Sequence, residues 1–170
     1  VLQNSNLEFP PGEQTQYSNT GYLILAMLIE KISQRSYSEF LEEMIFSPLN
    51  MHSTFVHDET AVLPENSALP YDENNILYEY EWYTYGAGGI YSTSHDMFEW
   101  DQSLYTELLI SKSTMQLATT GYTGGQNNYG YGWMVGGYEG NYSYRHGVFG
   151  LGILNYIYRV PGKNFMYLML

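Results

Sequence analysis

Apolar residues three or four positions apart fill the segment that follows Asn19 and Thr20. They are Tyr22, Leu25, Ala26, Ile29 and Ile32. This spacing places them on one face of a helix. Because Asn and Thr side chains cap helix N-termini well, the helix is predicted to begin near Asn19 or Thr20.

A second helical pattern starts at Ser36. Ser36 and Glu39 have the spacing of a capping box, in which each side chain bonds the backbone N–H of the other residue. Phe40, Leu41, Met44 and Ile45 then share one face. Since the residue before a proline is disfavoured in the helical region, this helix is predicted to stop before Pro48.

The middle of the chain has a weaker pattern. Prolines, asparagines and an aspartate interrupt residues 55–85, which predicts a long loop or a small subdomain. A third helix is predicted over residues 94–105, and a short fourth one over residues 112–117.

From Asn128 onward, tyrosine, glycine and β-branched residues replace the helical pattern. Turn signals occur at Gly136-Gly137, at Glu139-Gly140-Asn141 and at residues 161–164. They predict three or four antiparallel strands joined by tight turns. Helices followed by such strands indicate an α+β fold with helices packed on an antiparallel sheet. The 170 residues fit one domain, residues 1–170.

Charge and composition exclude several classes of protein. A net charge of −12 argues against nucleic acid and against anionic membranes as partners, because both attract clustered Lys and Arg. With no cysteine, the chain forms no disulfide and has no thiolate nucleophile. The longest apolar run, residues 22–29, is far shorter than the roughly 20 residues that span a bilayer.

No cofactor or metal is expected either. His52, His57, Asp58 and Glu59 do not have the spacing of a standard metal site. No glycine-rich segment is followed by the Lys-Ser or Lys-Thr of a phosphate-binding loop.

The most informative residues precede the first predicted helix. Tyr17 and Asn19 stand two positions apart, after the turn residues Pro11-Gly12. A phenol can act as a base if nearby cations lower its pKa, and an amide can both donate and accept hydrogen bonds. The same pair also fits a structural role, in which Asn19 caps the helix and Tyr17 packs beneath it.

Further segments follow this pair in a characteristic order. They are residues 46–51 (Phe-Ser-Pro-Leu-Asn-Met), 86–93 (Gly-Ala-Gly-Gly-Ile-Tyr-Ser-Thr), 129–133 (Tyr-Gly-Tyr-Gly-Trp) and 145–147 (Arg-His-Gly). In this order the chain resembles the serine β-lactamase and penicillin-binding-protein family, in particular its class C β-lactamase, D-alanyl-D-alanine carboxypeptidase and esterase branch. The resemblance extends from about Phe9 to the last residue and is most specific over residues 11–49.

The resemblance implies roles for individual residues. Tyr17 and Asn19 match the family's Tyr-x-Asn element, so Tyr17 would be the general base or proton relay and Asn19 would hold the substrate's amide. His146 and Gly147 open the His-x-Gly element, where His146 would bind the substrate carboxylate and help to lower the pKa of the phenol. The backbone N–H of Phe149 would be one oxyanion donor.

Two departures from the family's pattern stand out. No serine of this chain has a lysine three residues later, so the nucleophile's Ser-x-x-Lys element is expected upstream of Val1, in the same protein. The chain would then be the middle-to-C-terminal part of a β-lactamase-like domain, incomplete at both ends. At Val148 the His-x-Gly pattern expects glycine, and a valine side chain would intrude on substrate.

Three functions follow from these residues. The first is part of a serine hydrolase that acts by acyl transfer on D-Ala-D-Ala-like peptides, β-lactams or esters. The second, suggested by Val148, is a non-catalytic ligand-sensing domain on the same scaffold. The third is a carbohydrate-binding module, suggested by Trp82, Trp100, Trp133 and the many tyrosines. The resemblance also implies a location outside the cytoplasm, although Val1 to Pro10 does not have the pattern of a signal peptide.

Overall fold

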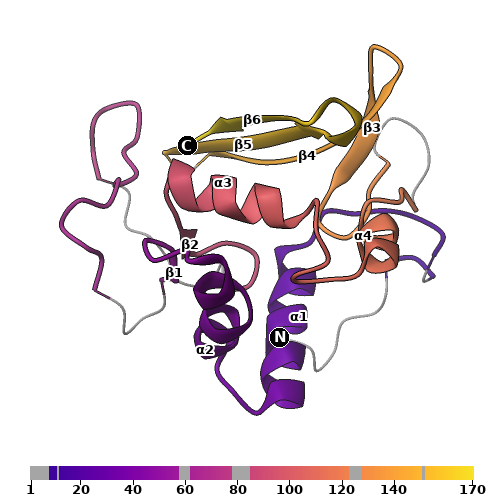
Figure 1. Ribbon diagram of the computed structural model, residues 1–170. Helices are drawn as coiled ribbons and strands as arrows, with labels where there is room; N and C mark the ends of the chain where they lie inside the picture. Colours follow the sequence, from indigo (N-terminus) through magenta and orange to yellow (C-terminus); the bar gives the residue numbers. More distant parts are fainter. Residues whose placement is uncertain (1–7, 11, 58–61, 78–84, 123–127, 151) are drawn as a thin grey trace.

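The computed structural model describes residues 8–10, 12–57, 62–77, 85–122, 128–150 and 152–170 (Figure 1). Its α-helices are α1 (Asn19–Ser33), α2 (Tyr37–Leu41), α3 (Ser94–Ser103) and α4 (Lys112–Ala118). A short antiparallel pair is formed by β1 (Phe55–Val56) and β2 (Ile90–Tyr91). The larger sheet contains β3 (Met134–Tyr138), β4 (Asn141–Gly150), β5 (Ile153–Val160) and β6 (Phe165–Met169).

Helix α1 begins at Asn19, as predicted, but its N-cap is one residue earlier than the predicted cap. Ser18, in an extended conformation, is the N-cap, and its Oγ accepts a hydrogen bond from the backbone N–H of Gly21 at 3.1 Å. Asn19 is therefore the first helical residue and not the cap. Ser18, Asn19 and Thr20 can all cap a helix, so sequence alone does not distinguish them.

Helix α2 has the predicted capping box between Ser36 and Glu39. This α-helix ends at Leu41, so the prediction that it stops before Pro48 is confirmed. After Leu41 the chain continues as a π-helical turn, Glu42–Phe46, and then as a 3₁₀ turn, Ser47–Leu49, that contains Pro48. Pro48 is tolerated because it lies in the first turn of the new helix, where its missing N–H would have no partner.

The larger sheet is a meander of four antiparallel strands in the order β3-β4-β5-β6. Glu139 and Gly140, both with positive φ, form the two-residue turn between β3 and β4. The turn predicted at Gly136-Gly137 is wrong, because both glycines lie within β3. The α+β fold predicted from the sequence is confirmed.

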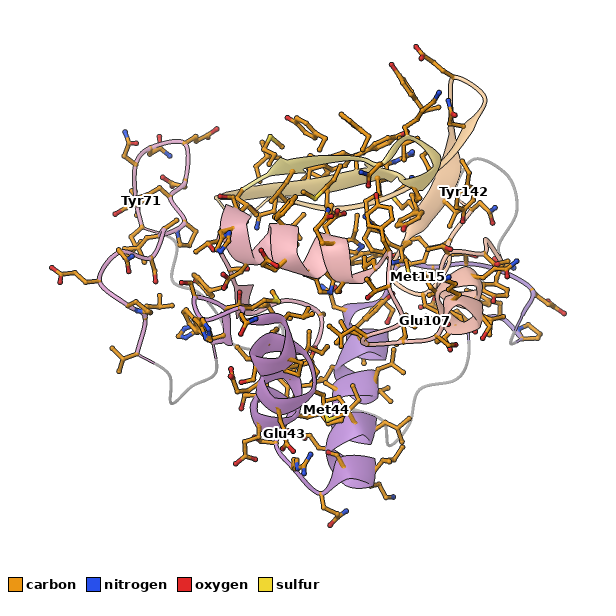
Figure 2. The ribbon with its side chains drawn as sticks, viewed as in Figure 1. Glu43, Met44, Tyr71, Glu107, Met115 and Tyr142 are labelled. Carbon is orange, nitrogen blue, oxygen red and sulfur yellow. The ribbon has the colours of Figure 1, made fainter. Side chains whose placement is uncertain are left out.

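The helices gather on one face of the larger sheet. Figure 1 shows α3 directly beneath β4, β5 and β6, with α1 and α2 farther from the sheet. One buried cluster joins α1 and α2 to the first strand pair, and a second contains Trp133, Tyr144 and Ile157 beneath the larger sheet. Trp100 of α3 packs against both clusters. At the right of Figure 2, the hydroxyl of Tyr142 on β4 donates to the carbonyl oxygen of Thr119, just past α4.

A buried ion pair fastens α3 to the sheet. Arg159 of β5 and Asp101 of α3 are almost completely buried, and the Nε of Arg159 bonds an Asp101 carboxylate oxygen. The same guanidinium donates to the hydroxyl of Tyr144 on β4 and to the Asp101 carbonyl at 3.1 Å. Burial raises the pKa of Tyr144 to about 12, so its phenol stays neutral.

The tryptophans that the structure describes belong to this core. The rings of Trp100 and Trp133 stack with their centroids 5.9 Å apart, and Trp133 is buried. They form no exposed platform on which a sugar could stack; Trp82 lies outside the described residues. Among the helices in the described ranges, none has the length and hydropathy needed to cross a bilayer.

Candidate functional site

The structure places Tyr17 and Asn19 at the N-terminus of α1, on either side of the capping residue. Tyr17 is 83% exposed, and Asn19 is also exposed. Since Ser18 caps the helix, the Asn19 amide is not used for capping. Neither side chain makes a hydrogen bond within the described ranges, so both can bind a ligand.

His146 lies on β4, and its ring is held by a neighbouring turn. The Nδ1 atom is 2.6 Å from the carbonyl oxygen of Gly132 and 3.4 Å from the hydroxyl of Tyr129. A carbonyl oxygen can only accept a hydrogen bond, so Nδ1 carries the proton in the shorter contact. The side chain of His146 is exposed, which leaves Nε2 open to a ligand.

Tyr129 lies near both Tyr17 and His146. Burial raises the pKa of its phenol well above the usual value, and the nearby phenols of Tyr22 and Tyr17 raise it further. Tyr129 is therefore a neutral hydroxyl close to both Tyr17 and His146. The fold thus brings the Tyr-x-Asn element and the histidine strand, more than a hundred residues apart in the sequence, to one place.

β4 offers an unpaired edge next to His146. Its ladder with β3 ends at the pair Met134↔Arg145, whereas its ladder with β5 continues to Gly150↔Ile153. Among the described residues, no strand pairs with the β3-side edge of residues 146–150. An extended peptide can add to such an edge through main-chain hydrogen bonds. Phe149 lies in this stretch, so its backbone N–H belongs to the segment in which the family resemblance places an oxyanion donor.

Gly147 and Val148 differ in the sheet face they occupy. Because side chains alternate along a strand, Val148 shares the face of His146, and it is 42% exposed. A Cβ at Gly147 would lie 2.5 Å from the Cδ2 atom of Tyr156 and 3.0 Å from the Asn155 carbonyl oxygen. Glycine at position 147 is thus explained by packing against β5, on the face opposite to His146.

Sequence reasoning missed the contribution of Tyr129 and Gly132. The segment Tyr129-Gly130-Tyr131-Gly132-Trp133 was recognised as a family element, but nothing in its pattern assigns a contact with His146. The described residues contain no group of three metal-binding side chains, while Asp58 and Glu59 lie outside them.

Known proteins resemble this chain in both sequence and structure. A penicillin-binding protein of Bacillus subtilis (strain 168) is 33% identical over 161 residues, which cover 79% of this chain and 35% of that protein. The crystal structure of a penicillin-binding protein from Bacillus halodurans superimposes with a TM-score of 0.82 at 23% identity, over 96% of this chain and 53% of that one. A D-stereospecific amidohydrolase from Streptomyces sp. gives a TM-score of 0.73 at 26% identity, over 90% of this chain and 48% of that one.

This chain therefore spans about a third of the B. subtilis relative and about half of each solved structure. The family model described as Beta-lactamase matches residues 1–170. Since that match covers every residue, the chain belongs to the Beta-lactamase family.

Proposed function

We propose that this chain supplies part of the active site of a serine hydrolase that works by acyl transfer. The observation that carries the proposal is the gathering of Tyr17, Tyr129 and His146 beside the unpaired edge of β4. The substrates proposed are D-Ala-D-Ala-like peptides, β-lactams or esters. The names of the relatives, penicillin-binding protein and D-stereospecific amidohydrolase, are consistent with this range.

The chemistry needs a nucleophile from outside this chain. A serine in a Ser-x-x-Lys segment would attack the substrate's carbonyl carbon and give its proton to the paired lysine or to Tyr17. The tetrahedral intermediate would place negative charge on the carbonyl oxygen, which the backbone N–H of Phe149 would stabilise. Tyr17 would then return the proton to the departing amine or alcohol, leaving an acyl-serine for water to hydrolyse.

Residues 1–170 would thus be the middle-to-C-terminal part of a β-lactamase-like domain. The partial coverage of the relatives supports this assignment. We also propose a location outside the cytoplasm, where cell-wall peptides ending in D-Ala-D-Ala would meet the site.

A panel of substrates tests the proposed activity. A protein that joins this chain to a Ser-x-x-Lys segment should hydrolyse at least one of three reporters: a chromogenic β-lactam, a D-Ala-D-Ala peptide or an activated ester. Replacing the serine of that segment should abolish turnover. Equal rates with and without the serine would refute acyl transfer by this mechanism.

Val148 distinguishes the enzyme from a non-catalytic ligand-sensing domain. If the whole protein is an enzyme, Val148→Gly should raise the acylation rate, because it removes a side chain from the face that His146 shares. A ligand-sensing domain would show no acylation with either residue. Acylation by a β-lactam, followed by stopped-flow absorbance, measures the difference, and Leu154→Ala on β5 is a matched control at an exposed apolar position. A sharp loss of activity on Val148→Gly, without loss of folding, would contradict this interpretation of the valine.

A further inference from the structure

The turn before β3 determines which nitrogen of His146 faces the site. The backbone N–H of Gly130 donates to the Trp133 carbonyl at 2.8 Å, and that of Tyr131 donates to the Ala118 carbonyl at 2.8 Å. Gly132 has a φ of 79°, a left-handed conformation that favours glycine. The turn is thereby fixed with the Gly132 carbonyl oxygen 2.6 Å from Nδ1 of His146.

That contact constrains the neutral imidazole. One ring nitrogen of a neutral histidine carries a hydrogen and the other a lone pair. Because Gly132 offers only an acceptor, the hydrogen lies on Nδ1 and the lone pair on Nε2. The Tyr129 hydroxyl also lies 3.4 Å from Nδ1. Within the described ranges, Nε2 has no hydrogen-bond partner.

We propose that the Gly132 carbonyl fixes neutral His146 as its Nδ1–H tautomer, so that Nε2 accepts a hydrogen bond from an N–H group of the ligand. The ligand class is then a carboxamide, a peptide amide or an amine. A carboxylate at the same position would need a donor, and neutral His146 has none left to offer, so the carboxylate binding that the family resemblance implies for His146 would require the protonated ring. This inference rests on the proposed function for the identity of the site, but the protonation of the ring nitrogens can be measured without any catalysis.

The direct test is ¹⁵N NMR of the histidine rings in this 170-residue chain. At a pH where the imidazole is neutral, His146 should show a protonated Nδ1 and an unprotonated Nε2. His52 and His95 are internal controls: both are exposed, and neither side chain makes a hydrogen bond within the described ranges, so they should exchange between the two tautomers. A majority of the Nε2–H form at His146 would overturn the proposal.

Two variants test whether the Gly132 carbonyl or the Tyr129 hydroxyl determines the tautomer of His146. Gly132→Ala has room for its methyl group, since the new Cβ would be 3.8 Å from the Tyr22 hydroxyl, but it strains the backbone and moves the carbonyl. It should lower the Nδ1–H fraction of His146, with the preference falling about threefold to tenfold, the size expected of one hydrogen bond. Tyr129→Phe should leave the tautomer unchanged. A switch of tautomer in Tyr129→Phe would overturn the assignment to Gly132, and the wild-type spectrum remains decisive if Gly132→Ala does not fold.

A matched pair of ligands tests the chemical class. Propanamide and propanoate differ only in a carboxamide against a carboxylate, and propanoate has no N–H group. At the same pH, the carboxamide should shift the Nε2 resonance of His146, and the carboxylate should not. A shift with the carboxylate alone, or with neither compound, would overturn the ligand class. Because the nucleophile takes no part in this titration, failure of the acyl-transfer proposal would leave its outcome unchanged.

Discussion

Replacing Tyr17 by phenylalanine is expected to slow acylation by about 10²–10⁴-fold in a protein that joins this chain to a Ser-x-x-Lys segment. That range is the usual contribution of a positioned acid or base. The fold should not change, because the ring of Tyr17 is 83% exposed and its hydroxyl makes no hydrogen bond within the described ranges. The rate of β-lactam acylation and the midpoint of thermal unfolding, measured on the same samples, separate the two effects.

Tyr138→Phe is the matched control for this experiment. Tyr138 is also an exposed phenol, but it lies at the end of β3, beside the turn to β4 and on the side of the sheet away from His146. Its loss should leave the acylation rate within about twofold of wild type, the usual result for a surface substitution. Equal rates in Tyr17→Phe and wild type would remove Tyr17 from the proposed mechanism.

Removing the carboxylate of Asp101 is expected to cause the largest loss of stability. In Asp101→Ala the guanidinium of Arg159, which is 0% exposed, would stay buried without its counter-charge. Breaking a buried pair in this way costs about 3–5 kcal/mol. Unfolding by urea, followed by tryptophan fluorescence, should report the change because Trp100 and Trp133 lie in the same core.

The exposed ion pair between Arg35 and Glu43 provides the comparison. Its atoms are 3.0 Å apart, but both side chains are substantially exposed, so Glu43→Gln should cost no more than about 1 kcal/mol. Figure 2 shows Glu43 near the end of the helical layer that is farthest from the sheet. Replacing both buried partners, as Asp101→Leu with Arg159→Met, should recover much of the lost stability. Losses of similar size in Asp101→Ala and Glu43→Gln would contradict the role given to burial.

Local signals in the sequence predicted most of the fold. The capping box at Ser36 and the turn at Glu139-Gly140 act through neighbouring residues, so their patterns are visible without tertiary structure. The errors also have local causes. The cap of α1 was misplaced by one residue among several side chains that can all cap a helix, and the two glycines expected to form a turn, Gly136 and Gly137, lie within β3.

The contacts that unite the site have no such local signal. Asp101 and Arg159 are 58 residues apart, and neither position differs in pattern from an ordinary charged residue on a helix or a strand. Tyr129 is one of 19 tyrosines, and only the fold places it near both Tyr17 and His146. Family resemblance identified Tyr17 and His146 as candidates, whereas their neighbours and the contact between His146 and Gly132 depend on the tertiary structure.

The oxyanion hole explains why this chain alone should not react. Its second donor would be the backbone N–H of the nucleophilic serine, and losing one donor costs roughly 10²–10³-fold in rate. No serine of this chain is followed three residues later by lysine, so the base beside the nucleophile is also missing.

Intact-mass spectrometry after incubation with a reactive β-lactam therefore tests the central claim most directly. The samples are the 170-residue chain alone and a protein in which a Ser-x-x-Lys segment precedes it. The predicted result is no stoichiometric adduct on the chain alone and one adduct per molecule, on the serine of that segment, in the longer protein. A stoichiometric adduct on a serine of the 170-residue chain, or none on the longer protein, would contradict the assignment.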